Sequence, residues 1–462
     1  MADLPNFDRR MSDAEGLMWR LDKDPHLSST FANITLLDRS PNLDVLLRRL
    51  ERATYVVRRL RQRVQPGPVG LGAPVWVDDP DFDLRYHVRH IALPKPGTMR
   101  QLLDLATLLT NDAFDRTRPL WQFVVIDGLR GGRSALLQKL HHTIVDGEGG
   151  VQLSLQYLDL ERDAPEPPPL DPDVIARADE AAHEPHHGET LRDVLAGSFR
   201  MPLGLAKQVK ELLADPTGIP AAGSAAADTV RGIVQQLSDV EAARSPLWVQ
   251  RSLGRRIEVL QAPFGECRQA AKRLGGTLNT VFLTAAADAA GRYHRELGAP
   301  VDTLRSSMVV STRTETSGAN AFSLARLLVP TGDMPLEDRF RAIQERTSEA
   351  RDGSSISGLE AITALTTALP TTVVTRLARQ QAQTVDFATS NVRGAPVPLY
   401  LAGAELLANH PVGPLMGVAF NLTLLSYNHS LDMGINIDTA AVAEPERLLR
   451  CLQRAFADLQ AA

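Results

Sequence analysis

Two adjacent histidines, His141 and His142, follow the apolar run 135–140 and precede Asp146-Gly147. An imidazole titrates near neutrality, so one ring nitrogen can take a proton from a hydroxyl while the oxygen attacks a carbonyl carbon. The other ring nitrogen must then carry a hydrogen that an acceptor holds. The pattern therefore predicts a site in which His142 is the general base.

The residues after the histidines indicate support for the base rather than a second acid. Asp146 lies only four residues beyond His142 in a tight loop, where a buried carboxylate needs a positive partner. Gly147 and the following glycines let the loop turn tightly and let a ligand approach the backbone. Taken alone, a histidine pair is an ordinary polar strand end and Asp-Gly is a common turn. The joint pattern behind a buried strand favours function.

A second histidine pair, His186-His187, serves as an internal comparison. It follows no apolar strand and lies in a proline-rich, charged stretch. With His183 and Glu184 it could bind a metal, but a solvated linker is the simpler interpretation. We therefore expect no metal site.

The segment 121–140 must position the catalytic pair. Its pattern predicts a strand over 121–126, a glycine-rich turn over 127–133 and a strand over 134–140, which places the histidines at a buried strand end. Elsewhere the elements that the pattern predicts include four helices and one hairpin. These are a helix opening at Ser40-Pro41, a helix over 98–113, an alanine-rich helix from near Thr277, a hairpin around Asn428-His429 and a last helix with Pro445 in its first turn.

The chain of 462 residues is too long for one ordinary core, so two domains are expected. Residues 161–190 are rich in proline and charge and are typical of a linker. The expected division is therefore a domain over 1–160, a linker over 161–190 and a domain over 191–462, both domains being of mixed α/β class.

Composition narrows the class of protein. The net charge of −5 argues against bulk binding of nucleic acid, which needs a basic face. The two cysteines, Cys267 and Cys451, form neither a disulfide framework nor a zinc motif, which favours a reducing, cytoplasmic compartment. The N-terminus lacks a signal-peptide pattern and no window reaches the length of a membrane span, so any membrane or lipid-droplet contact is expected to be peripheral.

Five segments together resemble one known family. "HHTIVDG" resembles the HHxxxDG signature of the chloramphenicol-acetyltransferase-like acyltransferases, a signature that peptide-synthetase condensation domains also carry. The flanking segments are similar to those of the bacterial wax ester synthase/diacylglycerol acyltransferase family. They are "FDRTRPLWQFVVIDGL", "SSMVVSTR", "SNVRGAPVPLYLAGAEL" and "HPVGPLMGVAFNLTLLSYNHSLDMGINID". They are spread over nearly the whole chain, so they are specific as a set.

The resemblance implies a fold and a reaction. The fold is two chloramphenicol-acetyltransferase-like sheet-plus-helix domains with the active-site channel between them. The reaction is transfer of a fatty acyl group from acyl-CoA to a long-chain alcohol or diacylglycerol, without an acyl-enzyme and without a cofactor. His142 would be the base, with His141, Asp146 and Gly147 completing the motif.

The resemblance also implies supporting residues. Arg313, which ends "MVVSTR", matches the arginine that pairs with the motif aspartate. Asn279 would stabilise the developing oxyanion or hold the histidine loop, although a helix N-cap is an equal alternative. Trp121, Ser390 and Asn391 would line the substrate channel, with core packing as the alternative for Trp121.

The chain departs from the family pattern at Gln122, Thr280 and Arg393, where glutamate, aspartate and proline are usual. These departures keep two other functions open. One is an acyltransferase that uses a carrier-protein thioester. The other is a paralogue that binds lipid or CoA without turnover.

Overall fold

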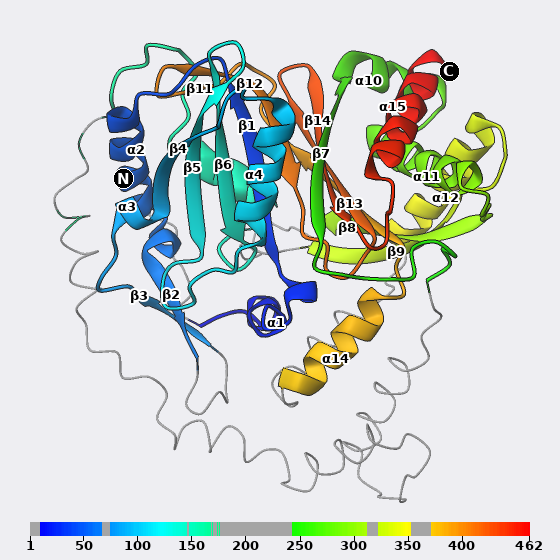
Figure 1. The fold of residues 1–462 in the computed structure, drawn as a ribbon, viewed down its shortest axis with the longest axis horizontal. Coiled ribbons are helices and arrows are strands. Elements are labelled where there is room, and N and C mark those ends of the chain that lie inside the picture. Colours follow the sequence, from blue (N-terminus) through cyan, green and yellow to red (C-terminus); the bar gives the residue numbers. More distant parts are fainter. Residues whose placement is uncertain are drawn as a thin grey trace, which may run out of the picture.

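The computed structural model describes most of the chain as two β-sheets flanked by helices. The described residues are 10–66, 74–145, 147–167, 169, 173, 175, 243–311, 322–352 and 371–462. The sheets lie side by side, with the first half of the chain on one side and most of the second half on the other (Figure 1). This arrangement confirms the expected mixed α/β class.

The first sheet has six strands in the order β11-β12-β1-β6-β5-β4. All neighbours are antiparallel except β4 and β5, which are parallel. The strands are β1 (Thr30–Leu37), β4 (Val88–Ala92), β5 (Trp121–Leu129), β6 (Arg133–His141), β11 (Tyr400–Leu401) and β12 (Ala404–Val412). The apolar segments around the histidines thus form the antiparallel pair β5–β6 in the middle of this sheet, as expected.

Helices and a small hairpin surround the first sheet. Helix α4 covers one face, where Leu102 and Leu103 pack against Ala32, Ile34 and Leu137 of the sheet. The other elements are α1 (Asp13–Leu21), a 3-10 turn (Pro25–Leu27), α2 (Leu43–Val56), a 3-10 turn (Arg58–Arg61), β2 (Gln62–Gln65), β3 (Val75–Asp78), α3 (Leu84–His87), α4 (Met99–Asn111) and α5 (Gly147–Ser154).

The second sheet has the order β7-β14-β13-β10-β8-β9. Strand β10 is parallel to both β13 and β8, and the other neighbours are antiparallel. The strands are β7 (Arg255–Pro263), β8 (Thr303–Ser311), β9 (Phe322–Pro330), β10 (Phe387–Arg393), β13 (Phe420–Tyr427) and β14 (Ser430–Asp438). Helices accompany it: α10 (Phe264–Arg273), α11 (Leu278–Glu296), α12 (Leu336–Asp352), α14 (Thr371–Ala382) and α15 (Pro445–Ala461).

Chain segments that are far apart in sequence join the two sheets. Strands β11 and β12 come from the second half of the chain but complete the first sheet beside β1. There the backbone N–H of Asn409 donates to Asp432 Oδ2 of β14 at 2.7 Å. Arg100 of α4 bonds Glu258 of β7 at 2.8 Å. The expected domain boundaries stay a prediction, because most of the linker lies outside the described residues.

Helix ends follow capping chemistry, with one correction to the expectations. Thr98 caps α4 through the backbone N–H of Gln101, as expected near that residue. Helix α2 instead begins after Asn42, whose side chain accepts from two backbone N–H groups, so the expected cap at Ser40 was wrong. Asn42 provides the carboxamide oxygen next to the first free N–H groups, and asparagine is as good a cap as serine.

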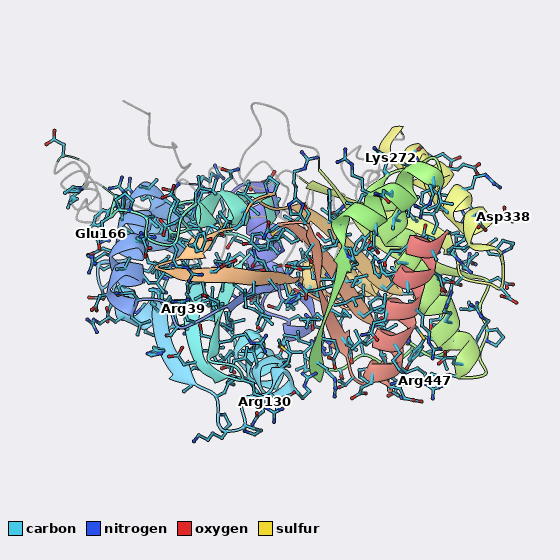
Figure 2. The ribbon with its side chains drawn as sticks, turned by 90° about the horizontal axis from the view of Figure 1, so that it is seen from above. Arg39, Arg130, Glu166, Lys272, Asp338 and Arg447 are labelled. Atoms are coloured by element: carbon cyan, nitrogen blue, oxygen red, sulfur yellow. The ribbon has the colours of Figure 1, made fainter. Side chains whose placement is uncertain are left out.

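The predicted hairpin is confirmed at Asn428-His429, where both residues have positive φ values of 38° and 68°. Two left-handed residues give the tight turn whose twist matches that of the flanking strands. The six charged side chains labelled in Figure 2 lie on the periphery of both halves, while the apolar clusters fill the layers between sheets and helices.

Candidate active site

The histidine pair lies where β6 ends. Strand β6 pairs with β1 on one side and with β5 on the other, and its residues Ser134 to His141 are buried. His141 is the last residue of β6, and His142 opens the turn that leads to α5. The backbone N–H of His142 donates to Ser29 O at 3.1 Å, which fixes this turn against the start of β1.

The side chain of His141 is held from both sides. Its ring is fully buried, and its Nδ1 lies 2.8 Å from Thr143 Oγ1 and accepts the backbone N–H of Thr143 at 3.2 Å. A backbone N–H only donates, so the ring hydrogen must lie on Nε2. Nε2 faces Asp22 Oδ1 at 3.5 Å. His141 is therefore a fixed structural element of the turn.

Asp22 completes this anchor from the N-terminal segment. It is the C-cap residue of α1, and its Oδ1 also accepts Ser28 Oγ–H at 2.8 Å. Burial alone would raise the pKa of Asp22, but the contact with His141, the Ser28 hydroxyl and the charge of Arg116 lower the pKa overall. A carboxylate thus stays charged beneath the histidine turn.

His142 lies on the opposite side of the sheet from His141. Its ring packs against Phe31, with ring centroids 4.5 Å apart and an interplanar angle of 39°. The residue is partly exposed, yet its ring lies so deep that burial, with the neighbouring His141, lowers the pKa of His142 to about 3. The ring there is neutral and therefore able to accept a proton.

The rest of the motif is described only in part. Gly147 is the first residue of α5, which lies against β10 of the second sheet. Asp146 and Arg313 both lie outside the described residues, so their ion pair stays a prediction. The contact between α5 and β10 nevertheless brings the histidine turn beside the strand that carries Ser390 and Asn391.

Two predicted supporting residues, Asn279 and Asn391, meet near the N-terminus of α11. Asn391 Nδ2 donates to Asn279 Oδ1 at 3.5 Å, and Asn279 Nδ2 lies 3.2 Å from Met308 Sδ. Asn279 is not the helix cap, because Thr277 accepts the N–H of Thr280 in that role. Ser390, the neighbour of Asn391 in β10, is partly exposed. Of the two alternatives for Asn279, the helix cap is therefore excluded.

Trp121 does not line a passage, which corrects one expectation. Its side chain is 1% exposed, and its Nε1–H donates to Leu60 O at 2.8 Å. The indole also stacks on His87 with ring centroids 4.6 Å apart. A tryptophan on a buried central strand with its one donor satisfied belongs to the core.

Sequence reasoning missed the polar residues on the sheet face that His142 shares. Asn33, Gln138 and Asn409 lie in three adjacent strands and are hydrogen-bonded to one another through Asn33. The available signal was an amide side chain inside a largely apolar segment: Asn33 in "TFANITLL" and Gln138 in "ALLQKLHH". Sequence reasoning also missed Asp22, because nothing local links it to His141.

Comparison with known proteins identifies the family. The model of the wax ester synthase/diacylglycerol acyltransferase catalytic domain matches residues 11–282, and the model of the C-terminal domain of the same family matches residues 318–460. The chain belongs to the wax ester synthase/diacylglycerol acyltransferase family. The resemblance inferred from the five segments is thereby confirmed.

Individual relatives agree with this family. A Mycobacterium tuberculosis protein provisionally named as a diacylglycerol O-acyltransferase is 32% identical, over 99% of this chain and 93% of the relative. A solved wax ester synthase/diacylglycerol acyltransferase from Marinobacter aquaeolei VT8 has the same fold, with TM-score 0.66, 23% identity and coverage of 98% and 99% of the two chains. A starter condensation domain of rhizomide synthetase, solved with C8-CoA, shares the fold at TM-score 0.55 and 15% identity, over 98% and 94% of the two chains.

Two of the three departures from the family pattern are hydrogen-bonded locally, and the third is exposed. Gln122, with its carboxamide oxygen turned toward Arg89, accepts from that guanidinium at 2.9 and 3.0 Å. The hydroxyl of Thr280 bonds both Thr277 and Gln344. Arg393 is exposed at the end of β10.

The described residues contain neither a membrane-spanning helix nor a cluster of metal-ligating side chains. Within those ranges, no helix is long and apolar enough to cross a membrane. In the same part of the chain, no three histidine, cysteine, aspartate or glutamate side chains are grouped as a metal site.

Proposed function

We propose that this member of the family transfers a fatty acyl group from acyl-CoA to the hydroxyl of a long-chain alcohol or a diacylglycerol, with His142 as the general base. Family membership supports the reaction class. The observation that carries the role of His142 is its position: a neutral imidazole at depth, partly exposed, at the end of a rigid strand.

The reaction needs one base and no acyl-enzyme. His142 takes the hydroxyl proton as the oxygen attacks the thioester carbonyl carbon, which forms a tetrahedral oxyanion. When the intermediate collapses, the carbon–sulfur bond breaks and the departing thiolate takes the proton from the imidazolium. An ester and free CoA result, and His142 is neutral again.

The lowered pKa of His142 affects this step. A buried imidazole becomes protonated only when a negative charge stabilises the imidazolium. In this reaction the oxyanion forms beside the ring and supplies that negative charge. In this proposal Asn279 and Asn391, paired at the N-terminus of α11, are the amide groups that stabilise the oxyanion.

Substitution of His142 tests the proposal directly. His142→Ala should lower kcat/KM for thiol release from a long-chain acyl-CoA, with hexadecanol as acceptor, by about 100-fold or more. His90→Ala is a matched control, since His90 is half-exposed on β4 and bonds only Asp127 within the described residues. Its rate should not change. A folded His142→Ala enzyme with wild-type turnover would refute the assignment.

Two comparisons separate this function from its rivals. A wild-type protein that accepts carrier-protein thioesters but not acyl-CoA would instead be a carrier-dependent acyltransferase. A protein that binds acyl-CoA without releasing CoA would be a binding paralogue.

The same proposal places the protein at lipid surfaces by peripheral contact, because both acceptors are water-insoluble. Leu155 and Leu160, which follow α5, are 52% and 71% exposed and could enter such a surface. Co-flotation of the protein with diacylglycerol-containing vesicles, and its loss in a Leu155→Ser/Leu160→Ser variant, would test this placement.

A further inference from the structure

Helix α5, which follows the histidine turn, needs contacts from the rest of the fold to hold its position. It spans only the eight residues Gly147–Ser154, and three of its first four residues are glycines. Glycine stabilises a helix less than alanine by about 1 kcal/mol per residue, and isolated helices shorter than about 12 residues are marginal in water. Contacts with the sheet must therefore keep α5 in place beside the turn.

Tyr157, three residues beyond α5, makes the main polar contact of this kind. Its side chain is 2% exposed, and its ring packs edge-on against Phe123 of β5 with ring centroids 5.7 Å apart. Its hydroxyl accepts from Gln138 Nε2 of β6 and lies 3.1 Å from Ser154 Oγ. Because the Ser154 hydroxyl donates to Gly150 O at 2.9 Å, the tyrosine hydroxyl donates to Ser154. The hydroxyl of Tyr157 thus joins the last turn of α5 to β6.

The strand end of this connection is itself fixed. Gln138 is buried, and its Oε1 accepts from Asn33 Nδ2 of β1 at 2.8 Å. That bond orients the carboxamide so that Nε2 is turned toward Tyr157. Burial raises the pKa of Tyr157, so its hydroxyl keeps the hydrogen that it donates to Ser154. We call the bonded series Gln138–Tyr157–Ser154 the α5 tether.

The α5 tether closes a loop that contains His142. Gln138 precedes His142 by four residues, about 13 Å at the spacing of a strand. Helix α5 is about 12 Å long, so it returns along β6 over the same distance. Only the five residues 142–146 separate the strand from the helix, so a shift of α5 would move the turn that carries the imidazole.

We propose that Tyr157 is a positioning residue, whose hydroxyl holds α5 against β6 and thereby fixes the turn that presents His142. This inference rests on the proposed function for the role of His142. A tyrosine that only stabilises the core would affect unfolding but not turnover by the folded enzyme. A tyrosine that positions the base also sets the geometry of proton transfer, where a displacement of about 1 Å can cost about 100-fold in rate.

Removal of the hydroxyl tests the proposal, because Tyr157→Phe keeps the buried ring. It should lower kcat for CoA release from a long-chain acyl-CoA, with hexadecanol as acceptor, about tenfold or more and leave KM within about twofold. Tyr293→Phe is the matched control. Tyr293 of α11 is equally buried, and its hydroxyl accepts the backbone N–H of Glu444 at 3.3 Å. The control should lower the midpoint of urea denaturation and leave kcat unchanged.

Ser154→Ala removes the helix end of the α5 tether from a partly exposed position. It should lower kcat by a factor comparable to that of Tyr157→Phe. The double variant Tyr157→Phe/Ser154→Ala should lose no more than the weaker single variant, because the two residues act through one hydrogen-bonded connection. Fully additive losses would mean that the two side chains act separately and would overturn the proposal.

Hydrogen exchange of the full-length protein tests the α5 tether without turnover. The backbone amides of residues 147–154 should exchange about tenfold faster in Tyr157→Phe than in the wild type, while those of α11 keep their rates. Tyr293→Phe should leave the exchange of 147–154 unchanged.

Each result decides the inference. Wild-type kcat in folded Tyr157→Phe would overturn it, as would unchanged exchange in α5 or a loss of kcat no larger than that of Tyr293→Phe. If Tyr157→Phe does not fold, Ser154→Ala decides by the same criteria. A wild-type protein that releases no CoA would refute the proposed function, and faster exchange in α5 would leave the α5 tether standing.

Discussion

The lowered pKa of His142 leads to a sharp prediction about pH. If His142 is the base, activity requires its neutral form, which exists above its pKa. An ordinary histidine with a pKa near 6.5 would be lost as a base between pH 7 and 6. Burial lowers the pKa of His142 to about 3, so kcat/KM should stay level as pH falls from 8 to 5.

The size of the effect follows from the same shift. Protonating the buried ring costs on the order of 5 kcal/mol more than protonating a solvated one. At pH 5 about 1% of a base with a pKa near 3 is protonated, against about 97% of a base with a pKa of 6.5. The two cases therefore differ by more than tenfold in kcat/KM at pH 5.

The assay is thioester consumption followed by absorbance, because thiol reagents lose reactivity in acid. The phosphates of CoA titrate in the same range, so a phosphate-free thioester of the same acyl chain is the matched control substrate. A fall in kcat/KM with a midpoint between pH 6 and 7 for both thioesters, while the protein remains folded, would refute the buried-base argument.

Stability supplies an independent check with a defined sign. Between about pH 6.5 and 3 the unfolded chain protonates this histidine while the folded chain does not, so folding stability falls as pH falls through that window. His142→Gln removes the effect. From pH 6.5 to 4.5 the wild type should lose about 2 to 3 kcal/mol more unfolding free energy than the variant, measured by urea denaturation. Equal acid sensitivity would mean that the ring is not desolvated.

Two further predictions concern the groups that hold the fold. Asp22→Ala should lower kcat about tenfold with little change in KM, because His141 loses the carboxylate opposite Nε2. Asp22→Asn should restore most of the rate. Equal losses of kcat in the two variants would contradict a positioning role for Asp22. Ser245→Ala should lower the free energy of unfolding by about 1 to 3 kcal/mol. The buried hydroxyl of Ser245 bonds His294 Nε2 at 2.7 Å and accepts the backbone N–H of Trp248 at 2.9 Å. An unchanged midpoint of urea denaturation would contradict this prediction.

Local chemistry explains what the sequence could predict. The strand that ends in His141 was predictable because a continuous apolar run bounded by turn residues has few alternatives to a buried strand. The turn at Asn428-His429 was predictable because it lies between two apolar, alternating segments. The cap at Asn42 was missed because Ser40, two residues earlier, is an equally good N-cap residue type. Only the backbone conformation decides which of the two begins the helix.

Long-range pairing explains what the sequence could not predict. Nothing in the segment 404–412 indicates that it completes the sheet formed by the first half of the chain, because strand partners are set by tertiary packing. The contact of Asp22 with His141 and the meeting of Asn33 with Asn409 span large separations in sequence for the same reason. Trp121 could have served either a passage or the core, and only its burial decided.

The adjacency of the two histidines has a physical reason in this geometry. Successive strand residues point to opposite faces of a sheet. Leu137 and His141 thus face the side covered by α4, while Gln138 and His142 face the opposite side, where His142 packs against Phe31. The first ring is fixed by Asp22 and Thr143, and it sets the turn from which the second ring is presented. A single histidine could not be buried for support and open to substrate at once, so the pair divides the two requirements between the two faces of one strand end.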